Sequence, residues 1–314
     1  MKTNLILDGN NLLHRTFHAN NRSGEPDDVV IGLCIHSALT TMNKYYNMFN
    51  PDDIIMTFDS HSWRKEYTKD LSKCVTNKKY KGTRRANQTP KEVRLFKLLD
   101  DHIDELYELL LHRTAVLTLR RNLLEGDDLM AAYVQMHRDD QNIIISGDKD
   151  MIQLLKYEGT RLINPATDED RTLKEWDDDA GLFLFEKCVR GDSGDNVQNA
   201  YPRLRKIKLF KAYTDQYERE NIMNHTFIQH EEVSKDEYAG VEYHTGALFK
   251  ENIVLMDLAA QPNVIKKEMV KEVLCAKKNR AKYNHRKFLK FCQVNELPNI
   301  IERVEAFVPM LTVS

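Results

Sequence analysis

Three short, mainly apolar runs in the first half of the chain each lead to an aspartate. The runs and the aspartates that follow them are 5–7 with Asp8, 54–58 with Asp59, and 143–145 with Asp148. Runs of this length that are apolar almost throughout are typical of strands buried on both faces of a parallel sheet. Helical spacing of apolar residues and two further strand-like segments fill the intervals, with helices expected at 29–49, 91–112 and 127–138 and strands at 115–119 and 162–164. The pattern therefore predicts an α/β fold.

Beyond about residue 180 the strand pattern fades and short helical patterns dominate. We therefore predict two domains, a core over residues 1–190 and an α-rich C-terminal region over 191–314. Within the second, residues 219–246 are polar and rich in turn-forming residues, which suggests an insertion.

Composition narrows the class of protein. The chain has 314 residues, of which 41% are hydrophobic, and its mean hydropathy is -0.57. No apolar stretch approaches the roughly 20 residues of a membrane helix, and the first residues run directly into a strand pattern without the features of a signal peptide. The five cysteines are scattered, which argues against a zinc site or a disulfide framework and favours a reducing compartment. We therefore expect a cytoplasmic location.

Charge is segregated along the chain although the formal net charge is only -2. Residues 61–100 hold 12 Lys and Arg against 4 Asp and Glu, and residues 265–290 hold 10 against 2. Between these blocks, residues 120–195 hold 10 basic against 18 acidic residues. Basic blocks of this kind can contact phosphate and the acidic block can hold cations, although each block is also compatible with a solvated face.

The acids of the central block follow the same logic as the strand-end aspartates. Ligands of open parallel sheets bind beyond the carboxyl ends of the strands, so acids far apart in sequence are expected at one edge. The full set of candidates is Asp8, Asp59, Glu125, Asp127, Asp128, Asp148, Asp150, Asp192 and Asp195. Clustered carboxylates repel one another unless cations neutralise them, and their hard oxygen ligands suit Mg²⁺, with Mn²⁺ as a substitute. Two such ions can drive in-line hydrolysis of a phosphodiester.

A structural alternative exists for single members of this set. Asp is a common helix N-cap and turn residue, so Asp127, Asp150 and Asp195 could each cap a helix and do nothing more. Capping alone, however, does not account readily for three strand-end acids together with the E-x-D-D and D-x-x-D patterns.

The ordered motifs resemble those of the 5′-nuclease (flap endonuclease) family over roughly residues 4–200. The motifs are L-D-G-N-N at 7–11, F-D at 58–59, L-E-G-D-D at 124–128, S-G-D-K-D-M-I-Q-L at 146–154 and G-D-S-G-D-N at 191–196. Within the family, the chain length and the run F-K-E-N-I-V-L-M-D at 249–257 are most similar to the bacteriophage ribonuclease H branch. The resemblance implies a PIN-like, mixed but mostly parallel sheet flanked by helices, and two divalent metal sites. It assigns Asp8, Asp59, Glu125, Asp127 and Asp128 to the first ion and Asp148, Asp150, Asp192 and Asp195 to the second.

The resemblance also implies a helical arch or clamp over about residues 61–100, with a Tyr-Lys-x-x-Arg element at Tyr80, Lys81 and Arg84. Lys81 and Arg84 would touch the scissile phosphate as catalytic residues beside Asp148, Tyr80 could stack on a base, and Arg64 would bind DNA near the start of the arch. One departure from the family pattern follows the last acidic motif, where a glycine-rich loop that binds duplex DNA and a monovalent ion is missing. The cationic residues that could replace its phosphate contacts are Arg203, Arg205, Lys206 and Lys208.

The expected activity is that of a Mg²⁺-dependent 5′ to 3′ exonuclease and flap endonuclease that removes RNA primers and 5′ flaps during DNA replication. Its substrates would be branched DNA and RNA–DNA hybrids with a 5′ end, and a replication clamp or a single-strand DNA-binding protein could be a partner. Two alternatives stay open at this point: a PIN-like ribonuclease acting on single-stranded RNA, and a non-catalytic DNA-binding protein on a nuclease scaffold.

Overall fold

A computed structural model describes residues 1–20, 27–84, 88–171, 179–234 and 237–313. By its contacts the chain divides into two compact units. The first unit comprises residues 1–62, 88–178 and 263–314, and the second comprises 63–87 and 179–262. The residues 85–87 of the predicted arch lie outside the described residues. No described helix combines the length and the apolar character that crossing a membrane requires.

The first unit is built on a six-stranded sheet with the order β3-β2-β1-β4-β5-β6. Its strands are β1 (Thr3–Asp8), β2 (Asp53–Thr57), β3 (Leu117–Leu119), β4 (Gln141–Ile145), β5 (Thr160–Asn164) and β6 (Glu169–Asp170). All neighbours pair in parallel except β6, which is antiparallel to β5. The central strands are buried along almost their whole length, as expected for a sheet covered on both faces. The predicted α/β class with a mixed, mostly parallel sheet is confirmed.

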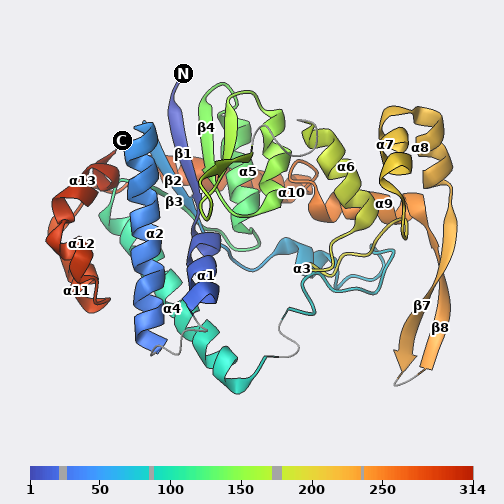
Figure 1. Cartoon of the computed structure of the whole chain (residues 1–314), viewed down its shortest axis with the longest axis horizontal. Coiled ribbons are helices and arrows are strands. Elements are labelled where there is room, and N and C mark those ends of the chain that lie inside the picture. The colour runs from blue at the N-terminus through green and yellow to red at the C-terminus, as the bar shows by residue number, and fades with distance from the viewer. Residues whose placement is uncertain (21–26, 85–87, 172–178, 235–236, 314) are drawn as a thin grey trace. The chain divides into compact units, whose positions relative to one another are not determined.

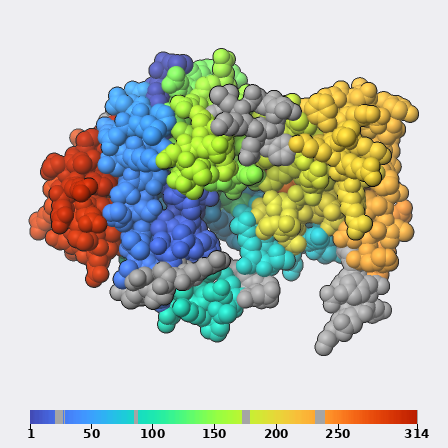
Figure 2. Space-filling model, in the orientation of Figure 1, coloured from blue at the N-terminus to red at the C-terminus, as the bar shows by residue number. Residues whose placement is uncertain are grey.

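Helices cover both faces of this sheet (Figure 1). On one face lie α1 (Gly9–Asn20), α2 (Asp27–Phe49) and α4 (Pro90–Arg113), joined by α11 (His285–Val294), α12 (Pro298–Glu302) and α13 (Val304–Thr312). On the other lie α5 (Gly126–Met136) and α10 (Asn263–Lys278), with the short helix η1 (Lys149–Lys156) beside α5. Figure 2 shows α2 in blue and the last helices in red at the surface of this unit. The C-terminal segment 263–314 thus contributes to the core of the first unit, where Phe288 and Met310 are fully buried.

The second unit is mainly helical. It contains α3 (Trp63–Tyr67), α6 (Ala180–Arg190), α7 (Lys206–Thr214), α8 (Gln216–Met223) and α9 (Thr245–Met256), with a hairpin of β7 (Thr226–Ser234) and β8 (Glu237–His244). The sequence pattern predicted few strands beyond about residue 180. That expectation is wrong for 226–244, which form this hairpin. Its antiparallel ladder satisfies the backbone, while Phe227 and Tyr243 pack against Leu248 and the neighbouring Ala200. Among the ribbon positions 226–230 and 239–244, Tyr243 is buried and the others are exposed or half-buried, so the polar composition concealed the strands.

Candidate active site at the carboxyl edge of the sheet

The strand register brings the predicted acids of the first unit to one edge of the sheet. Asp8 is the last residue of β1 and pairs with Thr57 of β2, two residues before Asp59. On the other side of β1, Leu7 pairs with Ile145 at the end of β4, three residues before Asp148. Because these strands are parallel, their carboxyl ends coincide, and the separations of about 50 and 140 residues along the chain disappear.

Asp8 lies at the centre of this edge. It is 6% exposed, and its two carboxylate oxygens accept hydrogen bonds from the backbone N–H of Asn11 (2.9 Å) and the hydroxyl of Ser146 (3.1 Å). Burial raises the pKa of Asp8 to about 7, and the charges of Asp59 and Asp148 act in the same direction against those two hydrogen bonds. An ionised Asp8 is therefore costly at neutral pH unless a cation lies beside it.

The start of α5 holds the next three acids. Gly126 donates its backbone N–H to Oδ1 of Asp59 (2.7 Å), which ties the helix to the loop after β2. Glu125 is buried and accepts a hydrogen bond from the hydroxyl of Ser62 (2.8 Å), while its own backbone N–H donates to Asp128 (3.3 Å). Negative charge at a helix N-terminus is favourable because the first peptide N–H groups point toward it.

The loop after β4 completes the edge. Asp148 precedes η1 and accepts a hydrogen bond from the backbone N–H of Asp150 (2.8 Å). The hydroxyl of Ser146 accepts in turn from the N–H of Asp148 (3.0 Å) and donates to Asp8, which links the two aspartates. Asp8 and Asp148 therefore do two things at once. Each accepts a hydrogen bond from a nearby backbone N–H group, and both lie at the same edge of the sheet.

Two adjacent asparagines, to which the sequence analysis assigns no role, hold this edge together. The side-chain oxygen of Asn10 accepts the backbone N–H of Asp59 (2.9 Å), and that of Asn11 accepts the N–H of Gly147 (3.0 Å). One turn of α1 thus connects the loops after β2 and β4. The signal in the sequence was their position in the D-G-N-N run that starts at the strand-end aspartate. Between that aspartate and the asparagines, a Cβ on Gly9 would come within 2.8 Å of the Thr57 carbonyl oxygen, so this close approach requires glycine.

Arg120, which was not predicted as a site residue, holds the loop that carries Asp59. Arg120, in the loop between β3 and α5, donates from Nε to the carbonyl oxygen of Asp59 (3.1 Å) and pairs with Asp104 of α4. Its backbone N–H donates to Glu272 of α10 (3.2 Å). Arg120 thereby joins two helices from opposite faces of the sheet to the loop that carries Asp59. An arginine after a short strand offers no sequence signal for this role, because its partners come from distant segments.

The donor set of the edge fits a hard divalent cation. Carboxylates, hydroxyls and amide oxygens are the groups that Mg²⁺ and Mn²⁺ prefer. The pKa of Asp8 is raised chiefly by burial and further by Asp59 and Asp148, so a cation beside it would stabilise its ionised form. As the described side chains stand, no three Asp, Glu, His or Cys residues converge closely enough to enclose an ion. Metal ligation by Asp8, Asp59, Glu125, Asp127, Asp128, Asp148 and Asp150 remains a prediction.

The remaining two predicted acids belong to the second unit, in the loop after α6. Asp192 forms a salt bridge with Lys187 (3.0 Å) and accepts the backbone N–H groups of Gly194 and Asp195. Burial alone would raise the pKa of Asp192, but Lys187 and these N–H donors outweigh it and the pKa is lowered. The loop starts at Gly191, whose φ of +68° and close approach to the Gln198 backbone both require glycine.

Asp195 connects this loop to the Tyr-Lys-x-x-Arg element. Its side chain accepts a hydrogen bond from the hydroxyl of Tyr80 (2.8 Å) and pairs with Arg84, and its carbonyl oxygen accepts the backbone N–H of Lys81 (2.8 Å). Lys81 adopts a positive φ of 53° and its ammonium lies over the Tyr80 ring. The structure therefore brings Tyr80, Lys81, Arg84 and Asp195 together. Their predicted roles toward DNA and metal remain predictions.

Burial sets conditions on two of the predicted DNA contacts. The Tyr80 ring packs with Cys188, Val197 and Leu255, so stacking on a base would require it to leave this cluster. Arg64 is 3% exposed, and its Nε donates to the carbonyl oxygen of Leu255 (2.7 Å). As it stands, Arg64 supports the packing of α3 against α9. By contrast, Arg203, Arg205, Lys206 and Lys208 are exposed at and before the start of α7.

Comparisons with known proteins agree with this architecture. Residues 3–180 match the family model of the 5′-3′ exonuclease, N-terminal resolvase-like domain. The 5′-3′ exonuclease of Buchnera aphidicola subsp. Schizaphis graminum is 26% identical over 206 residues, which cover 62% of this chain and 63% of that protein. The match thus spans less than two thirds of that relative's length.

Solved structures from bacteriophage T5 show the same fold. A T5 protein co-crystallised with metal ions superposes with a TM-score of 0.63 at 20% identity, covering 88% of this chain and 99% of that chain. The zinc-bound T5 5′-exonuclease gives 0.62 at 21% identity over 87% and 99%. A T5 flap endonuclease complex with DNA and metal ions gives 0.62 at 20% identity over 88% and 100%.

The fold and the family match together define the class. The family model covers more than half of the chain, and the chain therefore belongs to the 5′-3′ exonuclease family. This is a family of phosphodiester-hydrolysing nucleases, so the predicted family and class of enzyme are confirmed.

Proposed function

We propose that this protein is a divalent-metal-dependent 5′-nuclease that removes 5′ flaps and RNA primers from DNA during replication. The observation that carries the proposal is the buried Asp8 carboxylate, placed between Asp59 and Asp148 with its pKa raised to about 7. A protein gains nothing in stability from such an arrangement. It becomes favourable when a cation binds, which is what two-metal phosphodiester hydrolysis requires.

The relatives support the substrate class. The T5 flap endonuclease was solved with DNA and metal ions, and two other T5 structures hold metal ions, zinc in one of them. We propose Mg²⁺ as the ion, with Mn²⁺ as a substitute. Bound ions would polarise the scissile phosphate and lower the pKa of an attacking water.

The protein's own residues would do the rest. Asp8, Asp59, Glu125 and Asp148 would hold the ions, and Ser146, Asn10 and Asn11 would keep the three loops in register through the hydrogen bonds described above. Lys81 and Arg84 would contact the scissile phosphate. Arg84 would then exchange the Asp195 carboxylate for a phosphate oxygen, which is a like-for-like replacement of one anion by another.

Specificity would depend on the shape of the junction and on a free 5′ end, because phosphate contacts carry no base information. The exposed cations Arg203, Arg205, Lys206 and Lys208 would contribute salt-dependent affinity for duplex backbone. A clamp or a single-strand DNA-binding protein remains a proposed partner.

The test compares four labelled substrates: a 5′ flap, an RNA–DNA hybrid, linear single-stranded DNA and linear single-stranded RNA. Each is incubated with Mg²⁺, with Mn²⁺ and with EDTA. We expect cleavage of the flap and hybrid from the 5′ side with either ion and none in EDTA, and the Asp8→Asn variant should be inactive throughout. Faster cleavage of linear RNA would indicate a PIN-like ribonuclease instead. Binding of flap DNA without any cleavage would indicate a non-catalytic scaffold.

A further inference from the structure

The outward face of α10 carries exposed apolar side chains among lysines. We call this surface the α10 face, and it consists of Lys266, Lys267, Val270, Lys271, Leu274 and Lys278. Val270 is 41% exposed and Leu274 is 55% exposed. These residues border an open hollow of about 810 Å³. Val270 and Leu274 thus form a small exposed apolar patch rimmed by lysines.

The core does not use this face. The helix buries a different set of side chains, Ile265, Met269 and Val273, where it packs on α5 and β3. Those three residues follow helical spacing and complete an ordinary amphipathic stripe. Val270 and Leu274 form a second apolar pair, four residues apart, on the surface. The fold of the first unit gains little from them.

The charges of α10 are sorted between its faces. Its two acidic residues, Glu268 and Glu272, pair with Arg121 in the loop between β3 and α5. Lys277 lies with its ammonium 2.6 Å from Nε2 of His137, on the side of the helix that meets α5. Within the described part of the chain, no salt bridge involves the lysines of the α10 face. This surface is therefore positive throughout.

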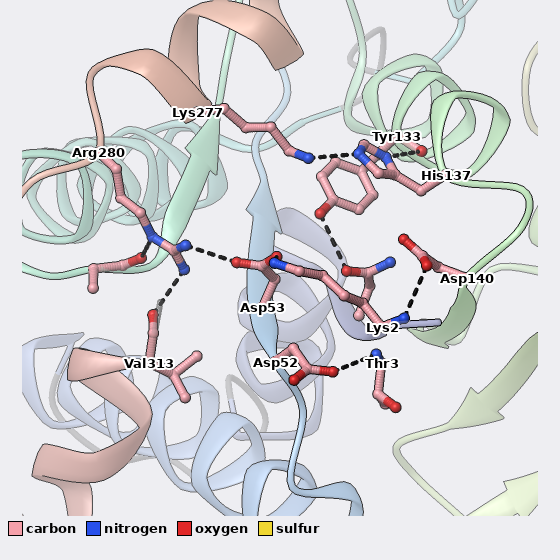
Figure 3. Close-up of polar contacts among 12 residues, drawn as sticks. Lys2, Thr3, Asp52, Asp53, Tyr133, His137, Asp140, Lys277, Arg280 and Val313 are labelled. Carbon is pink, nitrogen blue, oxygen red and sulfur yellow. Dashed lines mark hydrogen bonds and ion pairs between the residues drawn. The ribbon is translucent and has the colours of Figure 1, made fainter.

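The face is also held rigidly. Figure 3 shows Arg280, just beyond the end of α10, donating to Asp53 (2.7 Å) and to the carbonyl oxygen of Val313 (2.7 Å). Together with the Lys277–His137 contact, these bonds fix the C-terminal end of the helix to β2, to the end of α5 and to the residue after α13. A partner that binds here would order little of this protein, which favours affinity.

We propose that the α10 face is a docking site for an acidic peptide segment of a partner protein, one that places two or more apolar side chains on Val270 and Leu274. Charge complementarity supports this occupant, since four lysines surround the apolar pair. Val270 and Leu274 are one helical turn apart and lie on the same side of α10, so the apolar face of a bound amphipathic peptide can pack across both. A nucleic acid is the weaker fit, because phosphates need only the lysines and base stacking uses aromatic side chains, which this face lacks. The proposal does not depend on the nuclease activity.

The test is a selection from a displayed library of 16-residue peptides, using the full-length protein as bait. The counter-selection bait is the Lys267→Glu/Lys271→Glu double variant, in which both substituted residues are exposed. We expect enriched peptides to combine several Asp or Glu residues with apolar residues three or four positions apart. No enrichment over the variant, or enrichment of peptides lacking either feature, would overturn the proposal.

Fluorescence anisotropy with one enriched peptide then measures the contribution of each feature. The double variant and Leu274→Ser should each weaken binding by about tenfold or more. The control variant Lys287→Glu/Lys290→Glu removes the same charge from exposed positions of α11 and should leave binding within about twofold. Flap cleavage by all three variants should equal that of the wild type. A tenfold loss of flap-DNA affinity in the Lys267/Lys271 variant, without loss of peptide binding, would assign the face to nucleic acid instead.

Discussion

Replacing Asp8 by asparagine should stabilise the protein when no metal is present. Asparagine has the shape of a protonated aspartic acid. Its oxygen can still accept the N–H of Asn11, and its amide can donate to the Ser146 hydroxyl. The substitution therefore removes the buried charge and keeps the hydrogen bonds.

The magnitude follows from the pKa. The pKa of Asp8 rises from an ordinary value of 3.8 to about 7 in the folded protein, which corresponds to roughly 4 kcal/mol at about 1.4 kcal/mol per pH unit. Because the folded-state pKa is raised, the protonated carboxyl favours folding fully below pH 3.8, and this contribution disappears as the pH rises through about 7. The stability difference between Asp8→Asn and the wild type should thus be small at pH 4 and reach about 2–4 kcal/mol at pH 8.

Thermal and urea unfolding in EDTA across this pH range measure the effect. Added Mg²⁺ or Mn²⁺ should raise the midpoint of the wild type and leave that of the variant nearly unchanged. A matched control is Asp53→Asn, another buried aspartate of the same sheet, which pairs with Lys2 (3.1 Å) and Arg280 (2.7 Å). It should destabilise the protein by roughly 1–3 kcal/mol, since it leaves a mostly buried guanidinium without its anion. The reasoning about Asp8 fails if Asp8→Asn lowers stability at pH 8 in EDTA, or if its effect is independent of pH.

Four further predictions address the site and the fold. Asp148→Asn should reduce Mg²⁺-dependent flap cleavage by about a hundredfold or more with little change in unfolding midpoint, and wild-type rates would exclude it from metal binding. Lys81→Ala should lower turnover far more than substrate affinity, whereas equal losses would make Lys81 a binding residue. Arg120→Ala should weaken metal-dependent activity about 10–100-fold by releasing the Asp59 loop, with partial recovery in Arg120→Lys; unchanged metal titration curves would contradict this positioning role. Burial, with the charge of Lys277 adding to it, lowers the pKa of His137. Its neutral form is therefore the folded form, so stability should fall as pH drops below 6.5, and His137→Gln should reduce that dependence.

The metal edge was predictable from sequence because its position depends on a short-range rule. An apolar run ending in Asp8, Asp59 or Asp148 marks the end of a buried strand, and parallel strands all end at the same edge. No long-range information is needed to conclude that these aspartates meet. Helix α5 was also predictable from a local pattern, because the residues after Glu125 carry both acids and helical spacing of apolar side chains.

Other features depended on contacts that no local pattern encodes. The last 52 residues were predicted to be part of an α-rich C-terminal region over 191–314. In the structure α10 to α13 belong to the first unit, because helical periodicity defines an apolar face without saying what it packs against. Arg64 and Tyr80 were predicted to contact DNA from a basic segment. Which apolar surface their long side chains bury, and that they hydrogen-bond to the Leu255 carbonyl and to Asp195, came only from the structure.

By itself, the sequence determined the parallel sheet, the aspartates at the carboxyl ends of its strands and the family to which the chain belongs. These features follow from periodicity and short motifs. The tertiary structure alone decided which charges are neutralised and which are not. Asp53 and Asp195 pair with arginines, whereas Asp8 is buried near Asp59 and Asp148. Within the described residues, the lysines of the α10 face form no salt bridge. The reason is physical: the energy of a charge depends on burial and on neighbours within a few ångströms, and both are set only when distant segments pack together.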